Sequence, residues 1–169
     1  IDSILNVFLG DKGKKDVKEV TPIVNSVIKF EEELSKISND QLRSITQEFK
    51  DEIKQLKDPF SREIEDINKI IEKSENIDEN NASYKQIKKI QDQYLDKLDD
   101  YLNSILPKAF AVVKETTKRF KNNKEISVKA TPFDENLSSI KSYVKLNGNS
   151  AIWLNSWDAA GKSITWDMI

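Results

Sequence analysis

The chain has 169 residues, of which 33% are charged and 37% apolar, and its formal net charge is −2. It contains no cysteine, which excludes disulfides and thiolate catalysis, and no histidine, which excludes the usual general base of hydrolases and the commonest transition-metal ligand. The small net charge offers no long-range attraction for nucleic acid. Only four glycines and four prolines are present, so the composition favours a mainly helical fold with a modest core.

The first nine residues place apolar side chains at helical spacing, which predicts a short amphipathic helix that ends at Gly10. Lysines follow directly. An apolar stripe followed by lysines is typical of a segment that lies in an anionic membrane surface, although a helix docked on the body of the protein gives the same pattern. The candidate membrane- or channel-binding residues are Ile1, Ile4, Leu5, Phe8, Lys12, Lys14 and Lys15.

Two helices are expected next. Thr21-Pro22 predicts a helix over residues 22–37, with the threonine as its N-cap and the proline in its first turn. Ser38 and Gln41 have the spacing of a capping box, in which each side chain accepts a hydrogen bond from the backbone N–H of the other residue. This box predicts a further helix that reaches about residue 57.

Residues 58–104 have the pattern of a helical hairpin. Asp58-Pro59 is expected to break the preceding helix, and two narrow apolar stripes then flank the polar tract 74–83. Such stripes are typical of antiparallel helices that mostly bury each other. An arm of this kind suits a docking role, so a standalone helical adaptor that binds a protein partner through this hairpin is one hypothesis for the function.

Pro107 predicts the start of an apolar helix over residues 105–120, in which we expect Phe110, Val112 and Val113 to be core residues and not the lining of a cofactor site. The period then changes to alternation, which predicts a small antiparallel sheet in the last third of the chain. Asn147-Gly148 predicts a type I′ hairpin turn within it. The three tryptophans are expected to form its aromatic core: Trp153, Trp157 and Trp166.

Gly161-Lys162-Ser163 matches the end of the phosphate-binding P-loop, G-x-x-x-x-G-K-[ST]. The P-loop needs a strand before it and a long helix after it, so that backbone N–H groups surround the phosphates. Here Ser156 occupies the first glycine position, and strand-like alternation follows instead of a helix. We therefore expect an exposed turn at this place and not an ATP site.

Two helical blocks resemble the SecA family, the ATP-driven motor of bacterial protein export. Ser38-Asn-Asp-Gln-Leu-Arg-Ser-Ile-Thr-Gln-Glu-Phe-Lys50 is similar to the family pattern Ser-x-(Asp/Glu)-(Glu/Gln)-Leu-Arg-x-x-Thr-x-Glu-Phe-Lys. Leu106-Pro-Lys-Ala-Phe-Ala-Val-Val-Lys-Glu-Thr-Thr-Lys-Arg-Phe120 is similar to Leu-Pro-Glu-Ala-Phe-Ala-Val-Val-(Arg/Lys)-Glu-Ala. Asp167-Met168 looks like the entry to the adenine-contacting motif of the family, which makes Met168 a candidate cofactor-binding residue.

The resemblance implies that the parent protein is an enzyme, a translocase that uses ATP and Mg²⁺ to drive preproteins through the SecYEG channel. It implies a cytoplasmic protein, peripherally associated with the inner face of the cytoplasmic membrane, whose partners are SecYEG, anionic phospholipids and preproteins, with no nucleic acid among them. Because the chain stops before any Walker A motif, we expect it to be an N-terminal piece that is inactive alone, with no catalytic residue, metal ligand or cofactor of its own.

The expected fold class is mainly helical α+β, with a protruding antiparallel helical hairpin and a small C-terminal antiparallel sheet. We expect four parts along the chain: N-terminal helices over 1–57, an inserted hairpin over 58–104, an apolar core helix over 105–120, and a small β-sheet region over 121–169 that leads into the nucleotide-binding core. The stretches 58–104 and 121–165 depart from the common family pattern and look like lineage-specific insertions.

Overall fold

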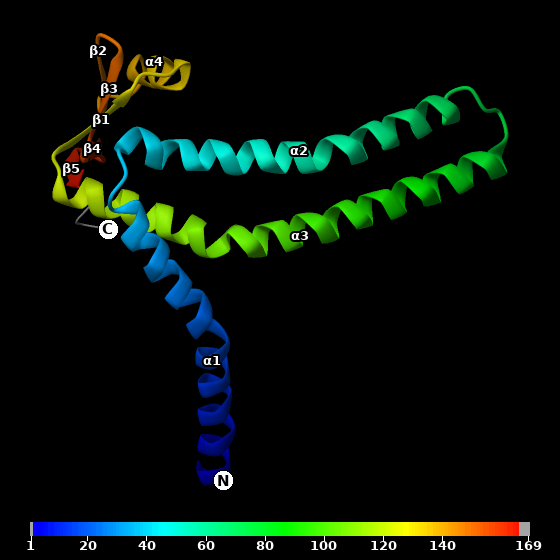
Figure 1. The fold of residues 1–169 in the computed structure, drawn as a ribbon, viewed down its shortest axis with the longest axis horizontal. Coiled ribbons are helices and arrows are strands. Elements are labelled where there is room, and N and C mark those ends of the chain that lie inside the picture. The colour runs from blue at the N-terminus through cyan, green and yellow to red at the C-terminus, as the bar shows by residue number, and fades with distance from the viewer. Residues whose placement is uncertain (1, 166–169) are drawn as a thin grey trace. The chain divides into compact units, whose positions relative to one another are not determined.

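The computed structural model describes the backbone of residues 2–165 and the side chains of residues 15–165. Within this range it contains four helices and five strands, which confirms the expected mainly helical α+β fold (Figure 1). The elements are α1 (Asp2–Leu34), α2 (Asn39–Ile71), α3 (Ile77–Asn122), β1 (Glu125–Lys129), α4 (Pro132–Ser138), β2 (Val144–Asn147), β3 (Ser150–Leu154), β4 (Ser156–Ala159) and β5 (Lys162–Thr165). They form two compact units: one combines the residues up to Ser44 with those from Pro107 onward, and the other is Ile45–Leu106.

Helix α1 is continuous, so the predicted end at Gly10 and the predicted new start at Pro22 are both wrong. A glycine inside a helix costs only about 1 kcal/mol, which the turns on either side can absorb. Pro22 lies within the helix, and the Thr21 hydroxyl donates to the Val17 carbonyl at 2.6 Å instead of capping a new helix. An internal proline and a hydroxyl bonded four residues back both bend helices, and the ribbon of α1 is visibly bent (Figure 1).

The capping box at the start of α2 is confirmed. The Ser38 N–H donates to Gln41 Oε1 at 2.9 Å, and the Gln41 N–H donates to Ser38 Oγ at 3.2 Å. The helix then passes through Pro59 and ends at Ile71, so the predicted break at Asp58-Pro59 is wrong. A proline removes one hydrogen bond, whereas the helix has 33 residues with which to hold its direction.

Helix α3 begins inside the tract that was expected to be a loop and has 46 residues. Asn76 is its cap, since Asn76 Oδ1 accepts hydrogen bonds from the N–H groups of Asp78 and Glu79 at 3.0 and 3.4 Å. The helix also contains Pro107, so the expected helix start at this proline is wrong. The hairpin is therefore made from parts of two long helices and not from two short ones.

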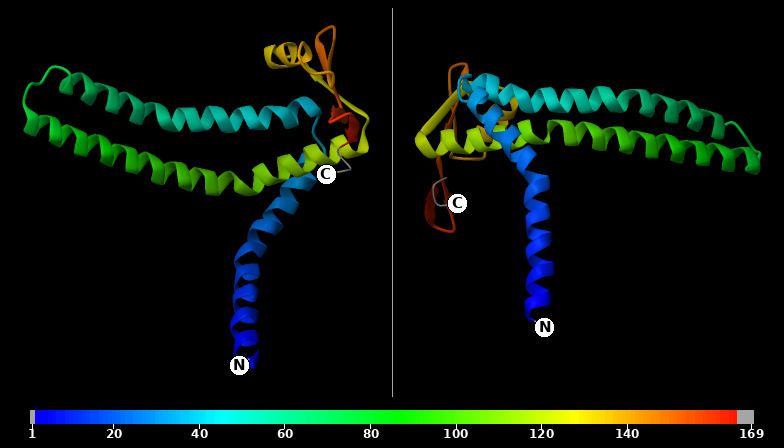
Figure 2. Two further views of the ribbon diagram at one scale, coloured as in Figure 1. Left: turned by 180° about the vertical axis from the view of Figure 1, so that it is seen from behind. Right: turned by 60° about the horizontal axis from the view of Figure 1, so that its bottom comes forward.

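The hairpin unit, Ile45–Leu106, packs along a single seam. Ile45 and Ile67 of α2 and Ile90 of α3 are buried, and the rings of Phe60 and Tyr94 lie 5.7 Å apart. In this unit the two helices run antiparallel, side by side in each view (Figure 2). The antiparallel helical hairpin predicted from the two narrow stripes is confirmed.

The strands form two sheets where one was expected. The first has the order β1-β3-β2 and is antiparallel, with Trp153 of β3 opposite Ile126 of β1 and Val144 of β2. Its core is Ile126, Val128 and Ala151, against which Phe120 and Trp153 pack. Trp157 lies instead in the second sheet, β4-β5, and Trp166 lies outside the described residues, so a joint tryptophan core stays a prediction.

The hairpin at Asn147-Gly148 is confirmed, but its turn type is corrected. Asn147 pairs with Ser150, so the two loop residues are Gly148 and Asn149. Gly148 has φ 56°, whereas Asn149 does not have a positive φ. A positive φ at the first loop residue alone is the mark of a type II′ turn. The type I′ pattern occurs in the β4-β5 hairpin, where Ala160 and Gly161 have φ 50° and 75°.

Candidate functional site

The two helical blocks meet in the first unit, around the side chain of Arg119 on α3. Arg119 Nη2 donates to the carbonyl oxygens of Leu34 and Ile37, both at 2.9 Å, and Nη1 donates to Asn39 Oδ1 at 2.8 Å. The last carbonyls of a helix have no partner within it. Arg119 therefore fills that need at the end of α1 and, through Asn39, holds the start of α2 as well.

The charge of Arg119 is balanced by Glu115, one helical turn earlier. Arg119 Nε donates to Glu115 Oε1 at 2.8 Å, and the Glu115 residue is only 4% exposed. Glu115 Oε2 has no hydrogen bond among the described residues, and Lys118 Nζ lies 4.0 Å from it. Such a buried ion pair holds Arg119 in place more than it adds to the free energy of unfolding, because both charged groups lose their hydration.

A second buried charge joins α2 to α4. Asp134 is completely buried, and its Oδ2 and Oδ1 accept hydrogen bonds from Arg43 Nη1 and Nη2 at 2.8 and 2.9 Å. The N–H and hydroxyl of Thr131 and Trp153 Nε1 also donate to this carboxylate. Burial alone raises the pKa of Asp134, but the bonds from Arg43 and Thr131 outweigh it, so the pKa lies below its ordinary value.

Two further contacts join helices and strands of the same unit. Lys114 of α3 forms a salt bridge with Glu31 of α1 at 2.6 Å, and this contact holds the pKa of Glu31 below its ordinary value. The Lys129 N–H of β1 donates to Asp40 Oδ1 at 2.7 Å, at the start of α2. We call this set of contacts around Arg119, Arg43, Glu31 and Asp40 the helix joint.

The helix joint is suited to holding segments in place. Its two arginines donate to carboxylates, backbone carbonyls and the side chains of Asn39 and Thr131, contacts that hold segments of the chain together. In residues 2–165, as far as side chains are described, no group of three or more acidic side chains could hold a metal ion. The helices of this part of the chain are too short or too polar for any of them to cross a membrane.

The predicted attachment residues lie at the start of α1. Ile1 is outside the described residues; the backbone of Ile4, Leu5, Phe8, Lys12 and Lys14 is helical, and their side chains are outside the described part. Lys15 is exposed, and its Nζ lies 3.9 Å from Glu19 Oε1. Attachment through this segment stays a prediction, as does the role of Met168, which is also outside the described residues.

The expectation that Phe110 and Val113 are core residues is wrong. They are 57% and 65% exposed, whereas Ala111, Val112 and Glu115 are buried. The buried side of this helix therefore includes the carboxylate of Glu115, which is paired with Arg119. Gly161-Lys162-Ser163 is part of an exposed turn between antiparallel strands, as predicted, and lacks the strand-to-helix geometry of a P-loop.

Sequence reasoning did not identify the residues of the helix joint. Arg43, Glu115 and Arg119 lie inside the two family-like blocks, which marked the segments but gave no role for these side chains. Asp134 had a local signal that was overlooked: Thr131-Pro132 followed by Asp134 is a capping box for α4, and the structure contains this box.

The comparisons with known proteins support the resemblance that the two helical blocks carry. The model of the SecA DEAD-like domain matches residues 5–138. Similar proteins include the protein translocase subunit SecA of Flavobacterium psychrophilum, 48% identical over all 169 residues, that of Christiangramia forsetii, 44% identical over the same length, and that of Bacteroides fragilis, 34% identical over 99% of the chain. No solved structure shows significant similarity to the chain. The chain spans about 15% of the length of each of these relatives. The matched blocks, the family model and these identities show that the chain belongs to the SecA family.

Proposed function

We propose that the chain is the N-terminal part of a SecA-type protein translocase subunit, in which it supplies membrane and channel attachment and a scaffold for the first nucleotide-binding domain. The observation that carries this proposal is Arg119, which connects both family-like blocks to the end of α1. Homology over the whole chain favours this function over that of a standalone adaptor.

The scaffold role rests on the helix joint. Arg119 of the second block bonds the turn that precedes α2, and Arg43 of the first block bonds the buried Asp134. Because the residues in these contacts are 80 or more positions apart in the sequence, they hold the last turns of α3 and the helix α4 against the end of α1 and the start of α2. Such a joint suits a part that must transmit force without chemistry of its own.

The attachment role rests on α1. This helix has 33 residues and is about 50 Å long at ~1.5 Å per residue. Lys12, Lys14 and Lys15 lie in its first half. Each lysine near an anionic lipid surface contributes about 1 kcal/mol of attraction, so three of them with an apolar stripe suit reversible, peripheral binding.

In the parent subunit this part would support ATP-driven movement of preproteins through the SecYEG channel at the inner face of the cytoplasmic membrane. ATP and Mg²⁺ would bind to domains beyond this chain. No affinity for nucleic acid is proposed, in keeping with the net charge of −2. The chain alone is expected to be inactive.

Vesicle binding tests the attachment role. We expect the chain to co-sediment with vesicles that contain anionic phospholipid and to lose most of this binding when Lys12, Lys14 and Lys15 are all replaced by glutamine. The matched control replaces Lys50, Lys54 and Lys57, three exposed lysines of α2, by glutamine, so that the net charge changes equally. If both variants lose binding equally, the binding depends on the overall charge of the chain, which would contradict attachment through α1.

Nucleotide binding tests the rest of the proposal. We expect a fluorescent ATP analogue with Mg²⁺ to bind the complete translocase subunit and to show no saturable binding to the chain alone. Saturable binding by the chain would show that it holds a nucleotide site, and the scaffold role as stated would be wrong.

A further inference from the structure

The turn between β2 and β3 leaves the Asn147-Gly148 bond open to water. Both residues are exposed, and Asn147 pairs with Ser150, so Gly148 and Asn149 alone form the loop. A Cβ placed on Gly148 would meet no atom within 4 Å beyond its neighbours in the chain, so the space around this residue is empty. Glycine also has no side chain that could shield its own backbone nitrogen. Both groups of this bond are therefore accessible.

Neither the Asn147 side chain nor the Gly148 nitrogen is held by a hydrogen bond in the described part of the chain. The carboxamide of Asn147 could donate and accept, but it has no partner there. The Gly148 N–H donates to none of the backbone carbonyls of the described residues. By contrast, the amide of Asn103 on α3 donates to Asp99 Oδ2 at 3.1 Å. The amide and the N–H that follows it are thus both free to react at this turn.

We propose that Asn147 is a modification site, at which the chain deamidates spontaneously through a cyclic imide. Asparagine amides are among the thermolabile groups of proteins. Loss of the Gly148 amide proton to hydroxide lets this nitrogen attack Cγ of Asn147. The new C–N bond closes the ring, while the bond from Cγ to the side-chain nitrogen breaks and that nitrogen leaves as ammonia.

Water then opens the imide ring at one of its two carbonyls. Addition at the former side-chain carbonyl gives aspartate, and addition at the backbone carbonyl of residue 147 gives isoaspartate. One water molecule is consumed and one ammonia is released, with no oxidation or reduction. Either product has a carboxylate where the neutral amide was, so the net charge becomes one unit more negative than the present −2.

The isoaspartate product changes the backbone of the hairpin. Its main chain runs through the former side-chain carbonyl, which lengthens the chain by one carbon atom before Gly148. This extra atom disturbs the pair Asn147–Ser150 that closes the hairpin. The Asn149 carbonyl of the same turn accepts a hydrogen bond from the Ala130 N–H at 2.8 Å. The disturbance is therefore expected to reach the residue that follows β1.

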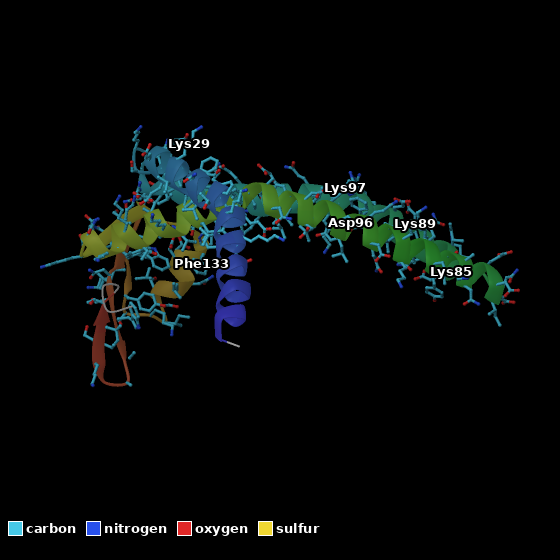
Figure 3. The ribbon with its side chains drawn as sticks, turned by 90° about the horizontal axis from the view of Figure 1, so that it is seen from below. Lys29, Lys85, Lys89, Asp96, Lys97 and Phe133 are labelled. Carbon is cyan, nitrogen blue, oxygen red and sulfur yellow. The ribbon has the colours of Figure 1, made fainter. Side chains whose placement is uncertain are left out.

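The affected hairpin belongs to the core of the first unit. Val144 of β2 and Ala151 of β3 are 2% and 0% exposed. Figure 3 labels Phe133 on α4, whose ring stacks on that of Trp153 in β3 with the centroids 6.3 Å apart. Isoaspartate in the turn should therefore loosen this unit as the protein ages. The proposal does not depend on the proposed role in translocation.

Other asparagines of the chain are protected from the same reaction. In Asn25-Ser26 and Asn103-Ser104 the nitrogen that would attack lies inside a helix, where its N–H is bonded to the carbonyl four residues earlier. In Asn149-Ser150 this nitrogen belongs to the strand β3. These three pairs are internal controls for the reactivity of Asn147.

Peptide mass spectrometry over time tests the site. The chain is incubated at neutral and at mildly alkaline pH, digested and compared with a sample that was not incubated, with fragment spectra to separate Asn147 from Asn149. We expect Asn147 to gain about one dalton and to do so about tenfold faster than Asn25 and Asn103, whose neighbouring nitrogens are bonded in helices. The rate should rise with pH, because the attacking nitrogen must lose its proton. Equal rates at these asparagines, or an unchanged Asn147, would overturn the proposal.

Two variants give an independent readout with a protein isoaspartyl methyltransferase, which transfers a labelled methyl group to isoaspartate. Asn147→Gln moves the amide one carbon away, so that ring closure needs a larger ring, and the label should be lost. The matched control Asn149→Gln changes the same turn and should keep the label. After incubation the original chain should unfold at a lower urea concentration than before, whereas Asn147→Gln should not change. A label that persists in Asn147→Gln and disappears in Asn149→Gln would place the reaction at Asn149 and overturn the proposal.

Discussion

Arg43 and Asp134 are 91 residues apart in the sequence, yet they form a two-pronged salt bridge with distances of 2.8 and 2.9 Å. The Asp134 side chain is fully buried, whereas that of Arg43 is 33% exposed. Because Thr131 and Trp153 also donate to the same carboxylate, the pair links α2, α4 and β3.

Replacing Arg43 should destabilise the first unit. In the Arg43→Ala variant the buried carboxylate of Asp134 keeps its neutral donors but loses the positive charge of Arg43 that compensates it. We expect the free energy of unfolding to fall by about 2–3 kcal/mol, at or below the low end of the range for broken buried pairs, because Arg43 is partly hydrated. Urea unfolding followed by tryptophan fluorescence measures this, since all three tryptophans lie beyond Pro107. The control Arg62→Ala removes an exposed arginine of α2 and should cost less than about 0.5 kcal/mol.

The same pair predicts a dependence on pH. The pKa of Asp134 is lowered in the folded state, so the carboxylate stabilises the fold fully above the ordinary aspartate pKa of about 3.9. This contribution is lost as the pH falls through the lowered pKa. We therefore expect the gap in unfolding free energy between the original chain and Asp134→Asn to narrow as the pH is lowered from 7 toward 3. A gap that stays constant over this range would contradict the assignment.

Tyr101 should titrate late. Burial and the hydrogen bond that its hydroxyl donates to Glu52 Oε2 at 2.7 Å raise the pKa of Tyr101 to about 12. The neutral phenol is favoured in the folded state, so its stabilising effect is complete below the ordinary tyrosine pKa of about 10 and is lost as the pH rises toward 12. In an alkaline absorbance titration we expect a step near pH 12 whose amplitude corresponds to the ionisation of one tyrosine. Tyr101→Phe should abolish the step, and Tyr84→Phe should leave it in place.

Arg119 should be needed for its shape as well as its charge. Arg119→Lys keeps the cation, but one ammonium group cannot reach four acceptors on three segments. We expect the variant to lose about 2 kcal/mol of unfolding free energy and to exchange amide hydrogens faster around residues 34–40. Lys121→Ala, an exposed change two residues later on α3, is the control. Unchanged exchange in Arg119→Lys would show that the turn before α2 does not depend on Arg119.

The elements that sequence reasoning found have local causes. The Ser38–Gln41 box, the helical hairpin and the Asn147-Gly148 hairpin depend on side chains within a few residues of one another or on a regular period. The helix breaks expected at Pro22, Pro59 and Pro107 failed because a proline removes one bond, and long flanking helices can keep the chain helical across it.

The sequence by itself determined the helical character, the hairpin, the strand-rich end and, through two short blocks, the family. Only the tertiary structure decided that Arg119 caps α1, that Arg43 meets Asp134, and that Phe110 faces outward while Glu115 is buried. The physical reason is the separation in sequence over which each interaction acts. Capping and periodicity act over three or four residues, whereas the partner of a buried charge 80 or more residues away is fixed only when the helices and strands have packed.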